Sequence, residues 1–212
     1  MQSTTWKISM CVAALVAACP ELALAQSATG AGATATGTSS VASGTSSTAT
    51  GYGATASGNA TTATGAFSKA TGVNSTADGY NAQALGDYSS AFGLNTTASG
   101  AQSTTLGAGS AATGDYSSAT GAYSQASGYA STANGYAAQA TNTDATAVGV
   151  AAVASGLSST AIGTASKATG PDSTALGVAA RRRQRTPRHS ASALRRPEST
   201  RQPRAQPVPR WA

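Results

Sequence analysis

The side chains that could do chemistry are few and badly placed for it. The 212-residue chain has one histidine, His189, and no cluster of cysteines or carboxylates lies near it. A nucleophilic serine or threonine needs a neighbouring base, and a metal site needs several ligands at short spacing. We therefore expect no catalytic, metal-binding or cofactor-binding residue and no enzymatic activity.

The carboxylates and the glycine-rich segments give no better candidate. Five aspartates lie between Gln26 and Ala180 and show no common period along the chain: Asp78, Asp87, Asp115, Asp144 and Asp172. Calcium-binding nonapeptide repeats would require Gly-Gly-x-Gly-x-Asp. The run GAGATATG at Gly30 has the glycine spacing of a phosphate loop, but no Lys-Ser/Thr follows it. We therefore expect neither a calcium nor a phosphate site.

The formal charge of +6 is segregated rather than spread over the chain. Lys69 and Lys167 against the five aspartates leave residues 26–180 at about −3. Ten arginines against Glu198 give residues 181–212 about +9. The tail could contact nucleic acid or anionic lipid only through nonspecific charge, and we expect no nucleic-acid function.

A strict heptad dominates what remains. Steps of seven from Gly30 to Gly177 meet glycine at 21 of 22 positions, the exception being Asn142. Alanine lies two residues before these positions, except at Thr105, and Ala, Ser or Thr lies four residues before, except at Gln26. Alternation within the unit is typical of a strand, and the glycine indicates a turn. A coiled coil is excluded because its seam needs large apolar residues and few glycines. The clearest turn glycines are Gly149, Gly156, Gly163, Gly170 and Gly177.

Stacked pairs of heptads predict an all-β, flattened parallel solenoid of 14-residue coils. The small residues would line a thin interior, and about eleven coils would give a rod roughly 50 Å long. The residue before every second glycine is apolar in five of eleven coils, which predicts an outward ladder: Phe92, Leu106, Val148, Ile162 and Leu176.

This ladder predicts self-association. Ordering one residue costs about 1–2 kcal/mol, whereas burying one methyl group stabilises by about 0.8 kcal/mol. An alanine-lined interior buries too little apolar surface to offset the conformational entropy that a single chain loses on folding. We therefore expect identical chains to bury the ladder against each other.

The tyrosines and Phe67 fall one or two residues after a register glycine, in the predicted bends. They could simply pack over the turn edges. They could also form a row of aromatic contacts for a protein or glycan ligand.

Both termini differ from the repeats. Lys7, the apolar run Ile8–Ala18 and Ala23-Leu24-Ala25 predict a signal peptide over residues 1–25, cleaved after Ala25. A lipoprotein-like box ending at Cys19 is the alternative. Residues 181–212 are rich in Arg and Pro and predict a disordered tail, either a frameshift product or a native basic segment.

The units STAIG, STALG and ATAVG, joined by TASKATG and VAAVASG, resemble the head repeats of trimeric autotransporter adhesins of the YadA type, over Gln26 to Ala180. The resemblance implies a left-handed parallel β-roll and a homotrimer whose interior Val148, Ile162 and Leu176 would line. It also implies a place on the outer membrane of a Gram-negative bacterium and a host matrix protein or glycan as partner.

The sequence departs from that family after residue 180, where we expect a neck, a stalk and a membrane anchor and find the arginine-rich segment. A truncated head, surface-attached in the intact family and here secreted or periplasmic, without an intrinsic membrane anchor, is therefore our expectation. Two alternatives are an ice-binding solenoid, suggested by TATG at Thr34 and Thr48, and a structural spacer.

Overall fold

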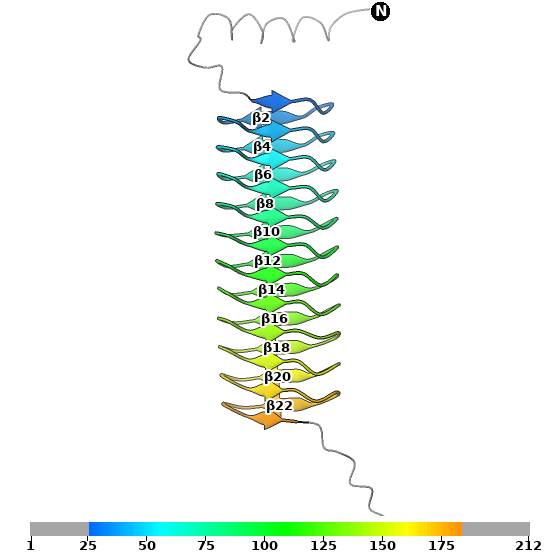
Figure 1. The fold of residues 1–212 in the computed structure, drawn as a ribbon, viewed down its shortest axis with the longest axis vertical. Coiled ribbons are helices and arrows are strands. Elements are labelled where there is room, and N and C mark those ends of the chain that lie inside the picture. Colours follow the sequence, from blue (N-terminus) through cyan, green and yellow to red (C-terminus); the bar gives the residue numbers. More distant parts are fainter. Residues whose placement is uncertain (1–25, 184–212) are drawn as a thin grey trace, which may run out of the picture.

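The computed structural model describes residues 26–183, which form one long parallel β-solenoid (Figure 1). The predicted signal peptide and residues 184–212 of the predicted tail lie outside the described residues. No helix occurs within residues 26–183, and two β-strands and two bends make each 14-residue coil. The predicted all-β solenoid of 14-residue coils is confirmed.

Two parallel sheets make up the solenoid, and we call them sheet A and sheet B. Sheet A has twelve strands and contains the odd-numbered ones. They are β1 Ser27–Ala28, β3 Val41–Ala42, β5 Thr55–Ala56, β7 Lys69–Ala70, β9 Gln83–Ala84, β11 Thr97–Ala98, β13 Ala111–Ala112, β15 Gln125–Ala126, β17 Gln139–Ala140, β19 Val153–Ala154, β21 Lys167–Ala168 and β23 Arg181–Arg182.

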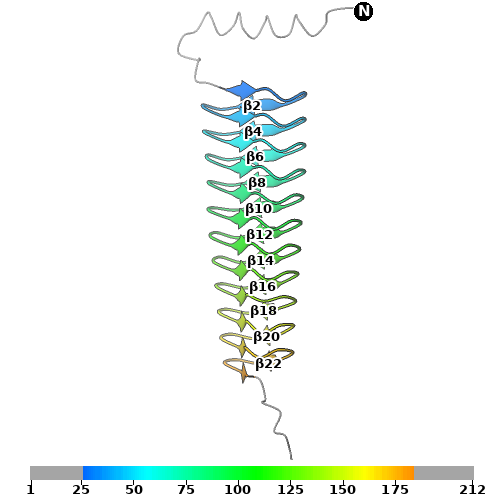
Figure 2. The same ribbon diagram turned by 45° about the vertical axis from the view of Figure 1, so that its right-hand side comes forward.

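Sheet B has eleven strands and contains the even-numbered ones. They are β2 Thr34–Thr36, β4 Thr48–Thr50, β6 Thr62–Thr64, β8 Thr76–Asp78, β10 Ser90–Phe92, β12 Thr104–Leu106, β14 Ser118–Thr120, β16 Thr132–Asn134, β18 Thr146–Val148, β20 Thr160–Ile162 and β22 Thr174–Leu176. The rotated view shows the two stacks of strands joined on both sides by bends (Figure 2).

Each strand pairs with the strand one coil before and one coil after it, always with a shift of 14 residues. Val148, for example, pairs with Ile162, and Ile162 pairs with Leu176. Equivalent side chains therefore stack in columns along the rod. The predicted alternation sets which column faces inward, because neighbouring residues of a strand point to opposite faces.

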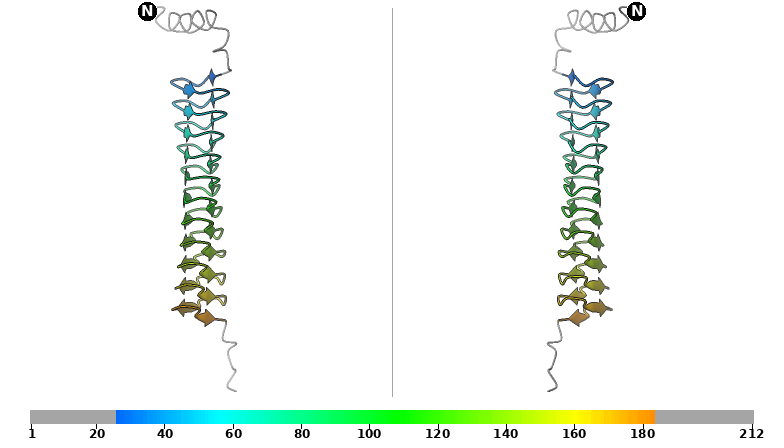
Figure 3. Two further views of the ribbon diagram at one scale, coloured as in Figure 1. Left: turned by 90° about the vertical axis from the view of Figure 1, so that its left-hand side faces the viewer. Right: turned by 90° about the vertical axis from the view of Figure 1, so that its right-hand side faces the viewer.

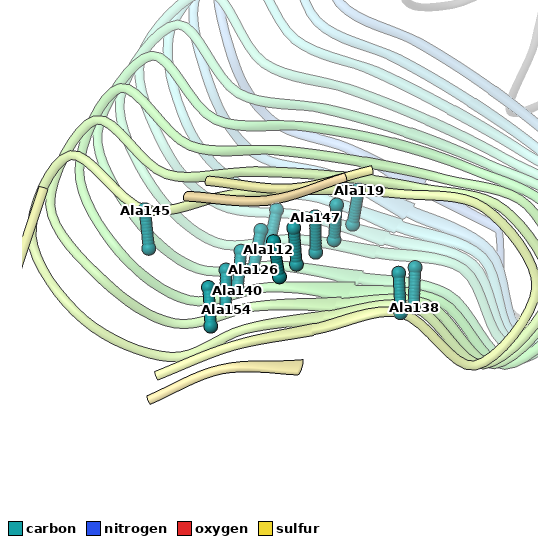
Figure 4. Packing of buried hydrophobic residues seen from close by; sticks show 13 residues of the cluster. Ala112, Ala119, Ala126, Ala138, Ala140, Ala145, Ala147 and Ala154 are labelled. Carbon is teal, nitrogen blue, oxygen red and sulfur yellow. The ribbon is translucent and has the colours of Figure 1, made fainter. Parts of the chain in front are cut away.

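The interior is a single narrow layer between the two sheets, seen edge-on in Figure 3. The alanines two residues before the register positions are buried from Ala42 to Ala175, and Ser, Thr or Ala four residues before fill the corners. Figure 4 shows Ala112, Ala126, Ala140 and Ala154 in one column opposite Ala119 and Ala147. Such small side chains let the sheets lie close together but bury little apolar surface per residue.

The bends form the two long edges of the solenoid. We call the bends that follow the strands of sheet B the first edge, such as Gly149 to Ala152, and those that follow sheet A the second edge, such as Gly156 to Ser159. The backbone N–H of Ala151, on the first edge, donates to the carbonyl of Tyr136 one coil before, at 2.8 Å. The bends are thus hydrogen-bonded from coil to coil, as the strands are.

The solenoid continues past Ala180, where the sequence pattern stops. Arg181 pairs with Lys167, and Arg182 pairs with Ala168, at the end of sheet A. This differs from the expectation of a disordered segment beginning at Arg181. Strand pairing uses backbone groups, and no described coil follows, so the arginine side chains remain exposed instead of entering the alanine column.

Candidate binding surfaces

The predicted ladder lies on the outward face of sheet B, at the last residue of each strand. Phe92 stacks on Leu106, and Val148, Ile162 and Leu176 stack in succession. Thr120 and Asn134 separate these two groups in the same column. The structure therefore brings the five ladder residues together as two apolar segments and not as one.

The ladder side chains are not covered within the described chain. Leu106 is 52% exposed, and Leu176, in the last coil of sheet B, is 70% exposed. The residue two places earlier in each strand faces the same way and is Ser or Thr throughout. The outward face of sheet B is thus a row of hydroxyl groups beside a row that is partly apolar.

The five predicted turn glycines all lie in bends, and the first edge makes a demand on backbone conformation that the second edge does not. On the first edge, Gly149, Gly163 and Gly177 have φ between +111° and +126°, a region that disfavours residues with a Cβ atom. On the second edge, Gly156 and Gly170 do not have positive φ. Close stacking of the coils applies on both edges, because a Cβ at Gly156 would run into the carbonyl of Gly170 and a Cβ at Gly149 into that of Gly163.

Asn142 occupies a register position on the second edge, where glycine is otherwise the rule. Its side-chain carbonyl accepts a hydrogen bond from the N–H of Thr143 at 2.9 Å, and its amide donates to the carbonyl of Ser155 at 3.2 Å. The second edge can therefore take a side chain where that side chain makes local hydrogen bonds.

The tyrosines and Phe67 project from both edges and are about half exposed. On the first edge, Phe67 makes edge-to-face contacts with Tyr52 and Tyr80, at centroid distances of 5.2 and 5.8 Å, and a further pair is Tyr123–Tyr136. On the second edge, Tyr116 lies 5.4 Å from Tyr129. These distances are typical of aromatic pairs that stabilise each other.

The charged residues are distributed unevenly between the two edges of the solenoid, which the sequence analysis did not predict. Four of the five aspartates lie on the second edge, in alternate coils: Asp87, Asp115, Asp144 and Asp172. The expectation that the aspartates have no common period is wrong for these four, because they shift by one residue within the bend but keep to every second coil. The first edge carries no charged residue from Gly37 to Ala180.

The second-edge carboxylates that form hydrogen bonds accept them from backbone N–H groups and do not form a ligand cluster. Asp87 accepts from the N–H of Val73, and Asp115 accepts from the N–H of Ala101, each at 2.8 Å and each from the preceding coil. Asn59 does the same for Thr45. Among residues 26–183, no three His, Cys, Asp or Glu side chains come together as a metal site would require.

Two sequence predictions cannot be placed in this geometry. His189 lies outside the described residues, as does the alternative lipidation site Cys19. Across residues 26–183, no helix is present that is both long and apolar enough to cross a membrane.

The architecture defines a class: a parallel β-solenoid of short coils, with a small-residue interior and extended outer surfaces suited to contact with other molecules. The family model of the YadA head domain repeat matches residues 28–54, 42–68, 70–96, 97–124, 126–152 and 154–180. The chain belongs to this family, and it is a YadA-like adhesin repeat protein, as the resemblance predicted.

Comparison with solved structures finds the collagen-binding domain of the Yersinia adhesin YadA at 29% sequence identity and a TM-score of 0.37. The match covers 68% of this chain and 65% of that one, so the chain spans less than two thirds of that structure's length. No curated protein matches the chain.

Proposed function

We propose that this chain is a non-catalytic adhesin head that binds a host matrix protein or a cell-surface glycan, and that it acts as a homotrimer. The observation that carries the proposal is the division of the surface. Of the exposed large apolar side chains in residues 26–183, none comes from a strand of sheet A. The outward face of sheet A is therefore a polar surface that can stay in water and meet a ligand.

This polar face is regular along the rod. Its outward columns carry mainly Thr, Ser, Gln and Lys, and Gln125 stacks directly on Gln139. Amide and hydroxyl groups at a repeat of about 4.8 Å offer many equivalent hydrogen-bonding positions. A long ligand could engage several coils at once, which raises affinity without any single strong site.

Sheet B is the face that we propose for trimerisation, with Val148, Ile162 and Leu176 lining the interior of the trimer. Four of its five ladder residues are exposed in one chain and Val148 is half-buried, while the alanine interior contributes little burial. Association of identical chains would cover the ladder and leave sheet A outward. The same chain would then have one face for its copies and another for its ligand.

Binding of the full chain to immobilised collagen, laminin and a panel of neutral and acidic glycans tests the adhesin proposal. We expect saturable binding to at least one of them, weakened tenfold or more by Gln125→Arg with Gln139→Arg. The pair Gln125→Asn with Gln139→Asn keeps the amides and serves as the control. Absence of saturable binding to every probe would favour the spacer alternative instead.

We also propose that the chain is exported and that its signal peptide is cleaved after Ala25. The solenoid begins at β1, directly after the residue that cleavage behind Ala25 would make the new amino terminus. Mass spectrometry of the chain produced with a secretion pathway should give Gln26 as the first residue. A lipid-modified Cys19 at the amino terminus would support the lipoprotein alternative and contradict the proposed cleavage site.

An ice-binding role has one observation in its favour. Thr34, Thr48 and Thr62 stack in register on sheet B, and Thr36, Thr50 and Thr64 form a parallel column beside them. The second column then breaks at Asp78 and Phe92. A flat hydroxyl array is thus confined to three coils, so the adhesin proposal is preferred.

A further inference from the structure

The apolar side chains outside the core lie on two neighbouring surfaces. Twelve of the seventeen exposed large apolar side chains in residues 26–183 belong either to the ladder column of sheet B or to the first edge. The two surfaces adjoin, because each ladder residue directly precedes the glycine that begins a first-edge bend. They are, on the ladder, Phe92, Leu106, Ile162 and Leu176, and on the first edge, Tyr52, Phe67, Tyr80, Leu94, Tyr123, Tyr136, Val150 and Val178.

The first edge is apolar where the ladder is polar. In the coils of β4, β6 and β8 the ladder column holds Thr50, Thr64 and Asp78, whereas the bends that follow hold aromatic rings. The same exchange occurs in the coils of β14 and β16, where Tyr123 and Tyr136 follow Thr120 and Asn134.

The reverse exchange completes the pattern. In the coils of β12 and β20 the first edge holds only small or polar residues, and the ladder supplies Leu106 and Ile162. Every coil from β4 to β22 therefore has a large apolar side chain on one of the two surfaces, and several coils have one on both. We call this continuous strip the seam.

We propose that the seam is the contact between copies of this chain, and that Tyr52, Phe67 and Tyr80 on the first edge take part in it where the ladder is interrupted. This inference rests on the proposed self-association along sheet B and extends it to the coils of β4, β6 and β8, where the ladder alone offers nothing apolar. The partner is a second copy, aligned in parallel and at the same height.

Three observations select this partner. The first edge has no charged residue, and protein interfaces are depleted of charge and enriched in aromatic rings at their centres. The seam changes from aromatic at β4–β8 to aliphatic at β18–β22, and only an in-register copy presents the same change at each level. A ring of three or more chains also needs two different contact surfaces on each chain, which sheet B and the first edge provide.

The second edge supplies a matched control. Tyr88, Tyr116 and Tyr129 are 52–60% exposed, compared with 46–54% for Tyr52, Phe67 and Tyr80. The first-edge set makes two edge-to-face contacts and the second-edge set makes one, so both triple variants lose ring contacts within one chain. They differ in lying on the charge-free edge or on the acidic edge.

The test compares the full chain with the triple variants Tyr52→Ser/Phe67→Ser/Tyr80→Ser and Tyr88→Ser/Tyr116→Ser/Tyr129→Ser. Analytical ultracentrifugation measures the dissociation constant of the oligomer, and circular dichroism checks the fold. We expect the dissociation constant of the first-edge variant to be at least thirtyfold higher than that of the parent. The dissociation constant of the second-edge variant should stay within threefold of the parent value. Equal effects of the two triples, or no effect of the first, would overturn the inference.

A conservative probe covers the case in which the first triple variant does not fold. Replacement of Tyr80 by the photo-crosslinking residue p-benzoylphenylalanine keeps an aromatic ring, and illumination should yield a covalent dimer or trimer of the chain. The same replacement at Tyr116 should leave monomers. Crosslinking at Tyr116 alone would contradict the inference.

Failure of the underlying proposal is recognised separately. If Ile162→Ser/Leu176→Ser leaves the oligomer intact, self-association along sheet B is wrong. If that variant dissociates the oligomer and the first-edge variant does not, the contact is confined to the ladder and only the role of the aromatic edge is wrong.

Discussion

Glycine on the first edge meets two requirements of the fold, a backbone conformation that disfavours a Cβ atom and close contact with the next coil. Substitutions at two of these glycines can separate the two requirements. Gly163 and Gly177 are consecutive members of one column with similar φ, +119° and +111°. A Cβ at Gly163 would lie 2.5 Å from the carbonyl oxygen of Gly177 and 2.7 Å from its carbonyl carbon. A Cβ at Gly177 would meet no atom of residues 26–183 within 4 Å. Gly163→Ala therefore suffers both strain and clash, and Gly177→Ala suffers strain alone.

The magnitude follows from these two terms. A residue with a Cβ in a disfavoured backbone region costs about 1–3 kcal/mol, which both variants share. Displacing the backbone of the next coil adds about 1–3 kcal/mol for Gly163→Ala only. In a chain of this size, 1 kcal/mol shifts the melting temperature by about 2–4 °C, so Gly163→Ala should melt roughly 2–12 °C below Gly177→Ala.

Thermal and urea unfolding followed by far-UV circular dichroism would measure this difference. Both variants and the parent must be compared at one protein concentration, because association shifts the apparent stability. Equal melting temperatures for the two variants would show that backbone conformation alone requires glycine on this edge. The argument from close stacking of the coils would then be refuted.

Three further predictions follow from the same columns. Ser124 donates to the carbonyl of Gly121 at 2.8 Å, whereas the buried hydroxyl of Ser166, at the same position three coils later, has no hydrogen-bond partner among residues 26–183. Urea unfolding should thus show Ser124→Ala losing about 1 kcal/mol relative to Ser166→Ala. Ile162→Ser with Leu176→Ser should lower the molar mass measured by light scattering toward that of one chain, and an unchanged mass would count against the ladder as an interface. The full chain should show no thermal hysteresis in freezing assays, since its threonine array covers only three coils; clear hysteresis would revive the ice-binding alternative.

Most of the fold was predictable because the same short pattern recurs in every heptad, so one rule for the orientation of strand residues applies along the whole solenoid. Alternation within a heptad fixes which side of the strand faces inward, so the burial of Ala147 and Ala161 follows from their place before Gly149 and Gly163. The same alternation placed Ile162 and Leu176 outward. The 14-residue unit was visible because the residue before the register position is large and apolar five times in one set of alternate heptads but only once, at Leu85, in the other.

The bends were less predictable because their chemistry depends on the next coil. The residue two places after the register position takes a left-handed conformation in many coils, with φ of 58° at Phe67 and at Tyr88, and the heptad pattern gave no sign of this. The alternate-coil aspartates were missed for a related reason. Asp115 and Asp144 are 29 residues apart, one residue more than two coils. A shift of one residue would move a strand side chain to the opposite face, whereas in a bend the side chain stays on the same edge of the solenoid.

The constant shift of 14 residues between paired strands has a consequence for how such a chain can vary. Because every coil presents nearly the same hydrogen-bonding edge to the one above and below, removal or duplication of an in-frame block of 14 codons would join two compatible coils. The rod would shorten or lengthen by about 4.8 Å, the distance between neighbouring strands. The length of the solenoid would thus change in fixed steps, without a new fold having to arise.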